Sequence, residues 1–147
     1  MHSDAILQTY LDRVAVAIMA NDWPSYADAV SLPFDLVTGG TSISVTTSDD
    51  LRVGFQSFVQ TLRTQQVTDY IRIVISSTYV SDDEITGSYD SHFTSHSYRI
   101  LPPFTSHISL RLVDQTWRAT SISNPLANAR WPLLLPRTIS DPDNRLS

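Results

Sequence analysis

The sequence contains no cysteine, no lysine and no long apolar run. Without cysteine it can form no disulfide, no thiolate metal site and no thiol nucleophile. No apolar run approaches the roughly 20 residues of a transmembrane helix, so no membrane partner is expected. The ten basic residues are all arginine, they do not cluster, and the net charge is −5, which excludes the basic surface of a nucleic-acid-binding protein. Because the N-terminus lacks the basic segment of a signal peptide, we expect a cytoplasmic protein.

The remaining composition, 41% hydrophobic and 17% charged over 147 residues, is typical of one globular domain. We expect its core at about residues 5–124 and a C-terminal arm at 125–147, apolar enough to pack back on the domain or on a partner. Apolar residues recur with helical spacing from Asp4 to Ala20 and from Leu51 to about Gln66. Pro24 suits the first turn of a short helix ending near Leu32.

The other segments are rich in β-branched residues and predict strands. The expected strands are 33–38 and 41–45 around a Gly39-Gly40 turn, 70–80, an unusually long 85–100 with a bulge or bend, and 107–113 and 116–123 around Asp114-Gln115. Helices followed by a meandering sheet indicate an α+β protein, with the helices on one face of an antiparallel sheet.

Three short segments carry a family resemblance: Ala20-Asn21-Asp22-Trp23, then Pro33-Phe34-Asp35-Leu36-Val37 leading to Asp49-Asp50-Leu51, and Asp114-Gln115-Thr116-Trp117-Arg118. With the order of elements, they resemble the nuclear-transport-factor-2-like (NTF2-like) superfamily, and within it the SnoaL-like branch, over about residues 7–124. The resemblance implies three helices packed on a strongly curved, mainly antiparallel sheet, a conical barrel with an internal cavity. It also implies a homodimer through the outer sheet faces. Members include isomerases, polyketide cyclases, dehydratases and ligand-binding domains without chemistry.

The 85–100 strand carries a polar stripe on one face: Asp90, His92, Thr94, His96 and Tyr98. Asp90 and His92 form its only compact pair, about 6–7 Å apart at Cα. A carboxylate that orients an imidazole is a general acid–base unit. If the opposite face, with Tyr89 and Phe93, lines the core, the pair instead faces solvent or a partner subunit. Asp35 lies near where the resemblance places an acidic base, and is the reserve candidate.

Metal and cofactor sites have little support. His92 and His96 would lie about 13 Å apart in a regular strand, too far for one ion. A bulge could shorten that distance, and His107 is the one candidate for a third ligand. Gly39-Gly40 is not followed by a helix and a lysine, so it is a turn rather than a phosphate loop. We expect no metal and no cofactor.

Seven aromatic residues predict an apolar cavity, unless they simply fill the core: Trp23, Tyr26, Phe34, Phe55, Tyr89, Phe93 and Trp117. Three functions stay open. The first is a homodimeric SnoaL-like domain that binds a small apolar molecule. The second is a cofactor-free isomerase, cyclase or dehydratase, with His92 as acid–base and Asp90 orienting it. The third is a structural dimerisation module whose cavity is filled by its own side chains. The facing of Asp90 and His92 separates them.

Overall fold

The computed structural model describes residues 2–39 and 41–126. Its first helix, α1 (Ser3–Met19), follows the predicted apolar spacing. The buried face of α1 comprises Leu7, Tyr10, Leu11, Val14, Ala17 and Ile18. The chain leaves the helix at Asn21, whose positive φ of 55° is a conformation that asparagine tolerates better than most residues.

None of the described helices is long and apolar enough to cross a bilayer, and the cytoplasmic location stays a prediction.

The second helix is shorter than the sequence predicts. α2 (Trp23–Asp28) begins at the N-cap Asp22, whose carboxylate accepts hydrogen bonds from the Ser25 amide (3.3 Å) and hydroxyl (2.7 Å). It ends before the predicted Leu32 because the chain enters the sheet there, and the Ala29 carbonyl accepts a hydrogen bond from the Ala119 amide (2.9 Å). The third helix, α3 (Ser48–Thr64), is capped at its N-terminus by the hydroxyl of the preceding threonine.

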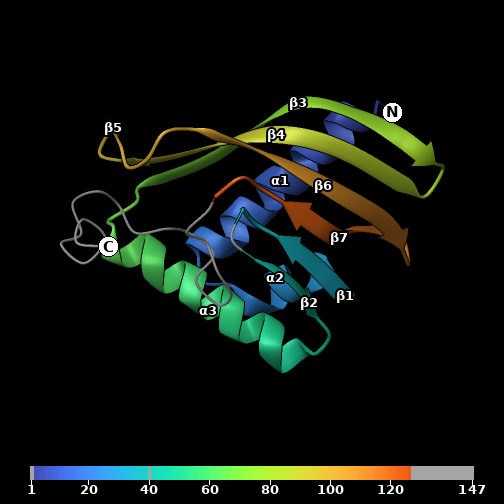
Figure 1. Ribbon diagram of the computed structural model, residues 1–147, viewed down its shortest axis with the longest axis horizontal. Helices are drawn as coiled ribbons and strands as arrows, with labels where there is room; N and C mark the ends of the chain where they lie inside the picture. The colour runs from blue at the N-terminus through green and yellow to red at the C-terminus, as the bar shows by residue number, and fades with distance from the viewer. Residues whose placement is uncertain (1, 40, 127–147) are drawn as a thin grey trace.

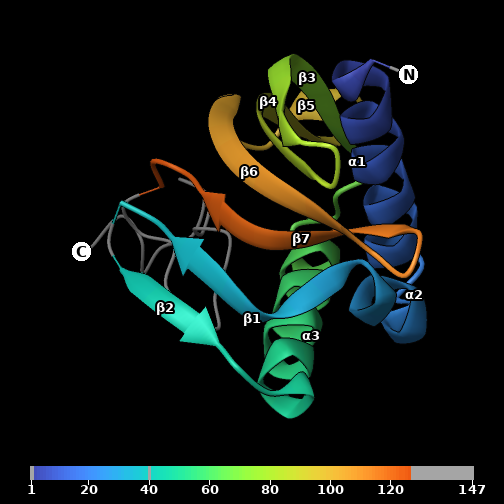
Figure 2. The same cartoon turned by 90° about the vertical axis from the view of Figure 1, so that its right-hand side faces the viewer.

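Within the described residues the strands form one sheet: β1 (Val30–Val37), β2 (Ser42–Val45), β3 (Asp69–Ser81), β4 (Glu84–Ser95), β5 (Tyr98–Arg99), β6 (Phe104–Val113) and β7 (Thr116–Ser123). Their order is β2-β1-β7-β6-β4-β3, and β5 pairs with β4. All neighbours are antiparallel except β1 and β7, which run parallel. The sheet curves around the three helices on its concave side (Figures 1 and 2). The predicted α+β fold is confirmed.

The predicted 85–100 strand is two strands joined by a reversal. β4 ends at Ser95, His96 and Ser97 adopt positive φ angles of 50° and 75°, and Tyr98 then pairs back with Ser95. Two successive positive φ angles characterise the tight turns whose twist matches a β-hairpin. Neither turn residue is glycine, so the sequence carries no signal for this turn. The polar stripe therefore stops at Thr94.

The facing of β3 is the reverse of what its hydrophobic pattern suggests. Arg72 points inward and is 5% exposed, whereas its neighbours Ile71 and Ile73 point outward and are each 52% exposed. β3 lies at the end of the sheet, and α1 covers part of its free edge. The Gln8 amide donates to the Arg72 carbonyl (2.7 Å) and accepts from the Val74 amide (3.0 Å). The helix thus takes the place of a neighbouring strand over this stretch.

The C-terminal arm is described only at its beginning. Leu126 packs against the core and donates its amide to the Asn124 side chain (3.0 Å). The predicted packing of the arm from Ala127 onward lies outside the described residues.

Candidate functional site

A cavity of about 80 Å³ lies between the concave face of the sheet and the helices. Its wall combines side chains from all three helices and from β1, β3, β4, β6 and β7. Sites for drug-sized ligands measure about 300–1,000 Å³, and one water needs about 10–15 Å³. The cavity is therefore large enough for a very small molecule and too small for a steroid-sized one.

Four of the seven predicted aromatic residues line this cavity, namely Tyr26, Phe34, Tyr89 and Phe93. The other three do not. Trp23 and Phe55 pack against each other and against Tyr26, so they form the layer behind the wall. Trp117 is half-buried and packs against the core. The alternative that aromatic residues simply fill the core holds for these three.

The most polar part of the wall comes from residues that the sequence analysis did not single out. Arg72 on β3 lies opposite Ser91 on β4 in the strand register, and Tyr89 of β4 lies opposite Ser106 of β6. Arg72, Ser91 and Ser106 are at most 5% exposed, and all line the cavity. Because side chains alternate along β3, Arg72 must face opposite to Ile71 and Ile73. The sequence favours placing the two isoleucines in the core, which would put Arg72 on the surface.

The Arg72 guanidinium has an unusual set of contacts. Its Nη2 donates to the Leu11 carbonyl of α1 at 3.0 Å. Its Cζ lies 5.0 Å and 5.5 Å from the ring centroids of Tyr70 and Tyr89, within the range of cation–π attraction. Its Nε is buried and has no hydrogen-bond partner. A buried donor without a partner is rare and costly in a folded protein.

Burial and mutual proximity shift the pKa values of this cluster. Burial raises the pKa of Tyr26 to about 12 and raises those of Tyr10 and Tyr70 in the same direction. Burial lowers the pKa of Arg72, but Tyr70, Tyr89 and Tyr10, with a hydrogen bond to Tyr89, more than offset it, and the pKa lies above its ordinary value. At neutral pH, Tyr10, Tyr26 and Tyr70 are therefore neutral and Arg72 carries a positive charge.

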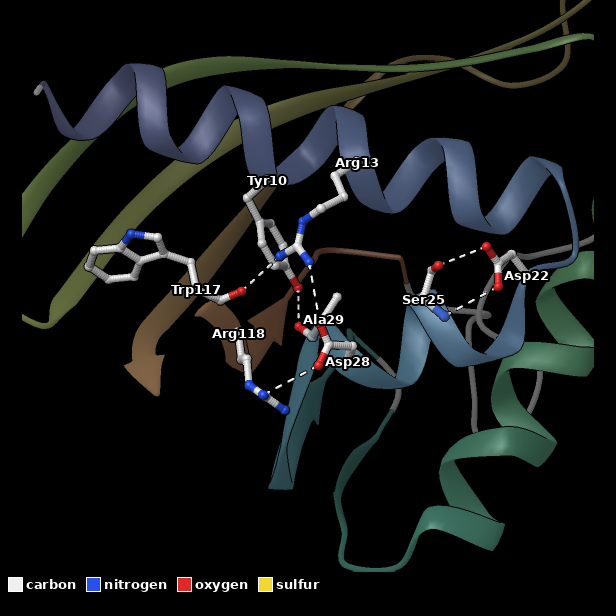
Figure 3. A network of polar contacts seen from close by, with 8 residues as sticks. All are labelled: Tyr10, Arg13, Asp22, Ser25, Asp28, Ala29, Trp117 and Arg118. Carbon is white, nitrogen blue, oxygen red and sulfur yellow. Dashed lines mark hydrogen bonds and ion pairs between the residues drawn. The ribbon is translucent and has the colours of Figure 1, made fainter. Parts of the chain in front are cut away.

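Tyr10, which lines the cavity, belongs to a polar network that connects the first two helices with the sheet (Figure 3). The Tyr10 hydroxyl donates its proton to the Ala29 carbonyl at 2.7 Å, so this proton is not directed at the cavity. Arg13 donates to the Trp117 carbonyl at 2.8 Å, and Arg118 pairs with Asp28 at 3.3 Å. These contacts join α1 and α2 to the start of β1 and to β7. They make Tyr10 a structural part of the wall rather than a free proton donor.

The predicted acid–base residues lie outside the cavity. Asp90 and His92 alternate with the buried Ser91 and Phe93 and point to the outer face of β4. Asp90 accepts a hydrogen bond from the Thr105 hydroxyl (2.6 Å), and the His92 Nδ1 lies 3.3 Å from an Arg99 nitrogen. Neither contact joins the two residues.

Asp35 is exposed and alternates with the inward Phe34 and Leu36. The structure therefore brings no predicted carboxylate or imidazole to the cavity. Across residues 2–39 and 41–126, no group of three His, Asp or Glu side chains is placed to hold a metal ion.

A second hollow, of about 510 Å³, lies on the outer face of the sheet. Its lining is mostly serine and threonine from β3, β4, β6 and β7, together with His107. It is more open than the cavity between the sheet and the helices, which is typical of a contact surface rather than of an enclosed small-molecule site.

Comparisons with known proteins bear on the fold. No protein-family model and no curated protein matches the chain. An NTF2-like protein of unknown function from Shewanella oneidensis superposes with a TM-score of 0.62 at 11% identity, covering 85% of this chain and 99% of the other.

Two further solved structures give the same picture. A protein of unknown function from Mycobacterium tuberculosis has a TM-score of 0.63 at 18% identity, with 93% and 79% of the two chains covered. A domain of unknown function with a cystatin-like fold from Nostoc punctiforme has a TM-score of 0.63 at 10% identity, with 85% and 78% covered. At such identities the likeness establishes the fold alone.

Proposed function

The chain has the NTF2-like, cystatin-like fold, and we propose that it uses this fold to bind a small molecule in the cavity between the sheet and the helices. One observation carries the proposal: a largely apolar cavity contains a few polar groups, among them the buried Arg72, Ser91 and Ser106. Apolar walls with a small number of placed polar groups are typical of ligand sites. A cavity that served packing alone would be filled by apolar side chains. The SnoaL-like branch stays a prediction.

The alternative of a cofactor-free acid–base enzyme draws less support. It depended on Asp90 and His92 facing a cavity, and both lie on the outer face. Among the described residues, the cavity lining includes no aspartate, glutamate or histidine. The structural-module alternative requires a filled cavity, whereas about 80 Å³ is left open.

The proposal is tested with a neutral probe of matching size. Butyramide is titrated into the protein, and binding is followed by amide chemical shifts. We expect saturable shifts at residues around the cavity. Ser106→Val adds bulk to the lining and should weaken binding at least fivefold. Thr105→Val, the matched change on the outer face of the same strand, should leave it unchanged. Absence of saturable binding, or equal loss in both variants, would refute the proposal.

We also propose that the protein forms a homodimer through the outer face of the sheet. Ile71, Ile73 and Ile75 form an apolar row on β3 with each side chain about half exposed, and the 510 Å³ hollow lies on the same face. Adjacent exposed apolar side chains of this size favour an interface. In analytical ultracentrifugation, we expect a dimer that Ile73→Asp converts to a monomer. Val53→Asp, at a similarly exposed position of α3, should stay dimeric. A monomeric unmodified protein would contradict the assignment.

A further inference from the structure

We propose that the cavity binds a short-chain monocarboxylate, whose carboxylate is held by Arg72 and whose alkyl part lies against the aromatic wall. This inference rests on the proposed function and adds the chemical class of the ligand. It follows from the contacts of Arg72, from the charges around it, and from the size and composition of the remaining wall.

Arg72 has a buried hydrogen-bond donor that lacks a partner. Arg72 is 5% exposed, so its guanidinium is withdrawn from solvent. Nη2 donates to the Leu11 carbonyl, but the Nε–H has no partner. Guanidinium groups are suited to carboxylates because their N–H donors lie in one plane. Arg72 also lines the cavity, so a carboxylate bound there would meet a guanidinium whose donors are not all used.

The positive charge of Arg72 has no acidic partner among the described residues. The two ion pairs found among the described residues both belong to Asp28, with Arg13 and Arg118. Neither involves Arg72, and none of the described residues that line the cavity is acidic. The rings of Tyr70 and Tyr89 offset part of the desolvation cost through cation–π attraction. Burying a charge without an ionic partner is otherwise expensive. An anionic ligand would supply the partner.

The composition and size of the cavity favour a small monocarboxylate as the anion. One guanidinium supplies one positive charge, which matches a monoanion better than a phosphate dianion. Ser91, directly opposite Arg72 in the register, and Ser106 on the next strand offer hydroxyl donors for the carboxylate. The rest of the wall, including Phe34, Phe58 and Phe93, suits an alkyl group. Because a cavity of about 150 Å³ accommodates benzene, a cavity of about 80 Å³ indicates a chain of a few carbons.

The test compares sodium butyrate with butyramide, which has a similar shape and no charge. Both are titrated at pH 7 and constant ionic strength set with sodium chloride, and dissociation constants are taken from chemical shifts. We expect butyrate to bind at least tenfold more tightly, because a hydrogen bond to a charged group is worth more than a neutral one. Arg72→Met should abolish this preference and leave butyramide binding in place. Arg111→Met, at an exposed position of β6, should keep the preference.

A measurement on the unmodified protein covers the case in which Arg72→Met does not fold. The Nε–H resonance of Arg72 should move on addition of butyrate, and butyramide should move it less. If the two probes bind equally, the ligand class is wrong while the proposed function stands. If neither binds, the proposed function fails as well. If butyrate binds more tightly but the Nε–H resonance does not move, the carboxylate is held elsewhere and the role of Arg72 is refuted.

Discussion

Gly87 of β4 lies in close contact with α1 and with the neighbouring strand β3. A Cβ atom added there would lie 2.6 Å from Leu7 Cδ2, 2.8 Å from the Ser76 carbonyl oxygen and 3.0 Å from Ser77 Cβ. Its φ is not positive, so glycine is needed for the missing side chain and not for its backbone freedom. We predict that Gly87→Ala lowers the free energy of unfolding.

The magnitude follows from how little each contact can relax. The Ser76 oxygen belongs to the backbone of β3, and Leu7 is fully buried in the core, so neither moves into open space. Overpacking of this kind costs about 1–3 kcal/mol. Replacing glycine by alanine restricts the unfolded chain and returns about 0.4–1 kcal/mol. With the middle of each range, about 2 and about 0.7 kcal/mol, the net loss is about 1.3 kcal/mol, which lowers Tm by about 3–5 °C for a domain of this size.

Urea unfolding followed by circular dichroism measures this loss directly. Ser88→Ala, the neighbouring residue on the outer face, should change stability by less than about 0.5 kcal/mol. In a Leu7→Ala background the penalty of Gly87→Ala should shrink, because one of its three contacts has been removed. If Gly87→Ala is neutral or stabilising, or if its penalty is the same in both backgrounds, the close approach of α1 to β4 is refuted.

Three further outcomes are expected. Tyr10→Phe should cost only about 0.5–1.5 kcal/mol in urea unfolding, because the Ala29 carbonyl keeps its hydrogen bond from β7; a loss above about 3 kcal/mol would contradict this accounting. The raised pKa of Tyr26, about 12, and those of the other two buried tyrosines mean that stability is fully present below about pH 10, where unfolded phenols titrate, and falls as the pH rises above it. The share of the phenolate absorbance that belongs to these three buried phenols should then appear together with unfolding, and its appearance before unfolding would refute their burial. Asp90→Asn and His92→Ala should leave butyramide and butyrate binding unchanged by chemical-shift titration, and a tenfold loss would restore the acid–base pair as part of the site.

The elements that could be predicted are those whose local signals agree with their packing. The helices α1 and α3 follow their apolar spacing, β1 and β2 pair as the predicted hairpin, and β6 and β7 pair around Asp114 as expected. Together with the resemblance to NTF2-like proteins, they were sufficient for the fold.

The site could be predicted only in part. Tyr89 and Phe93 alternate with the polar stripe, so strand geometry predicts only that they face away from Asp90 and His92. The sequence leaves open which pair faces inward, and in the structure it is Tyr89 and Phe93. Arg72 could not be found in the same way, because alternation assigns its strand the opposite facing when the isoleucines are taken as core. The turn at His96-Ser97 could not be predicted because neither residue is the glycine, asparagine or aspartate that usually marks a hairpin turn with two positive φ angles.

The reversed facing of β3 has a consequence for how this strand finds its place. A slip of one residue against β4 would exchange its two faces, burying the isoleucines and returning Arg72 to water. Hydrophobic burial by itself therefore favours the wrong alignment. The two hydrogen bonds from Gln8 to the backbone at Arg72 and Val74, and the stacking of Tyr70 on Phe93 with ring centroids 4.6 Å apart, belong to the native alignment alone. The register of the strand that carries the charge is thus selected by a helix formed more than fifty residues earlier in the chain, and not by the strand's own apolar pattern.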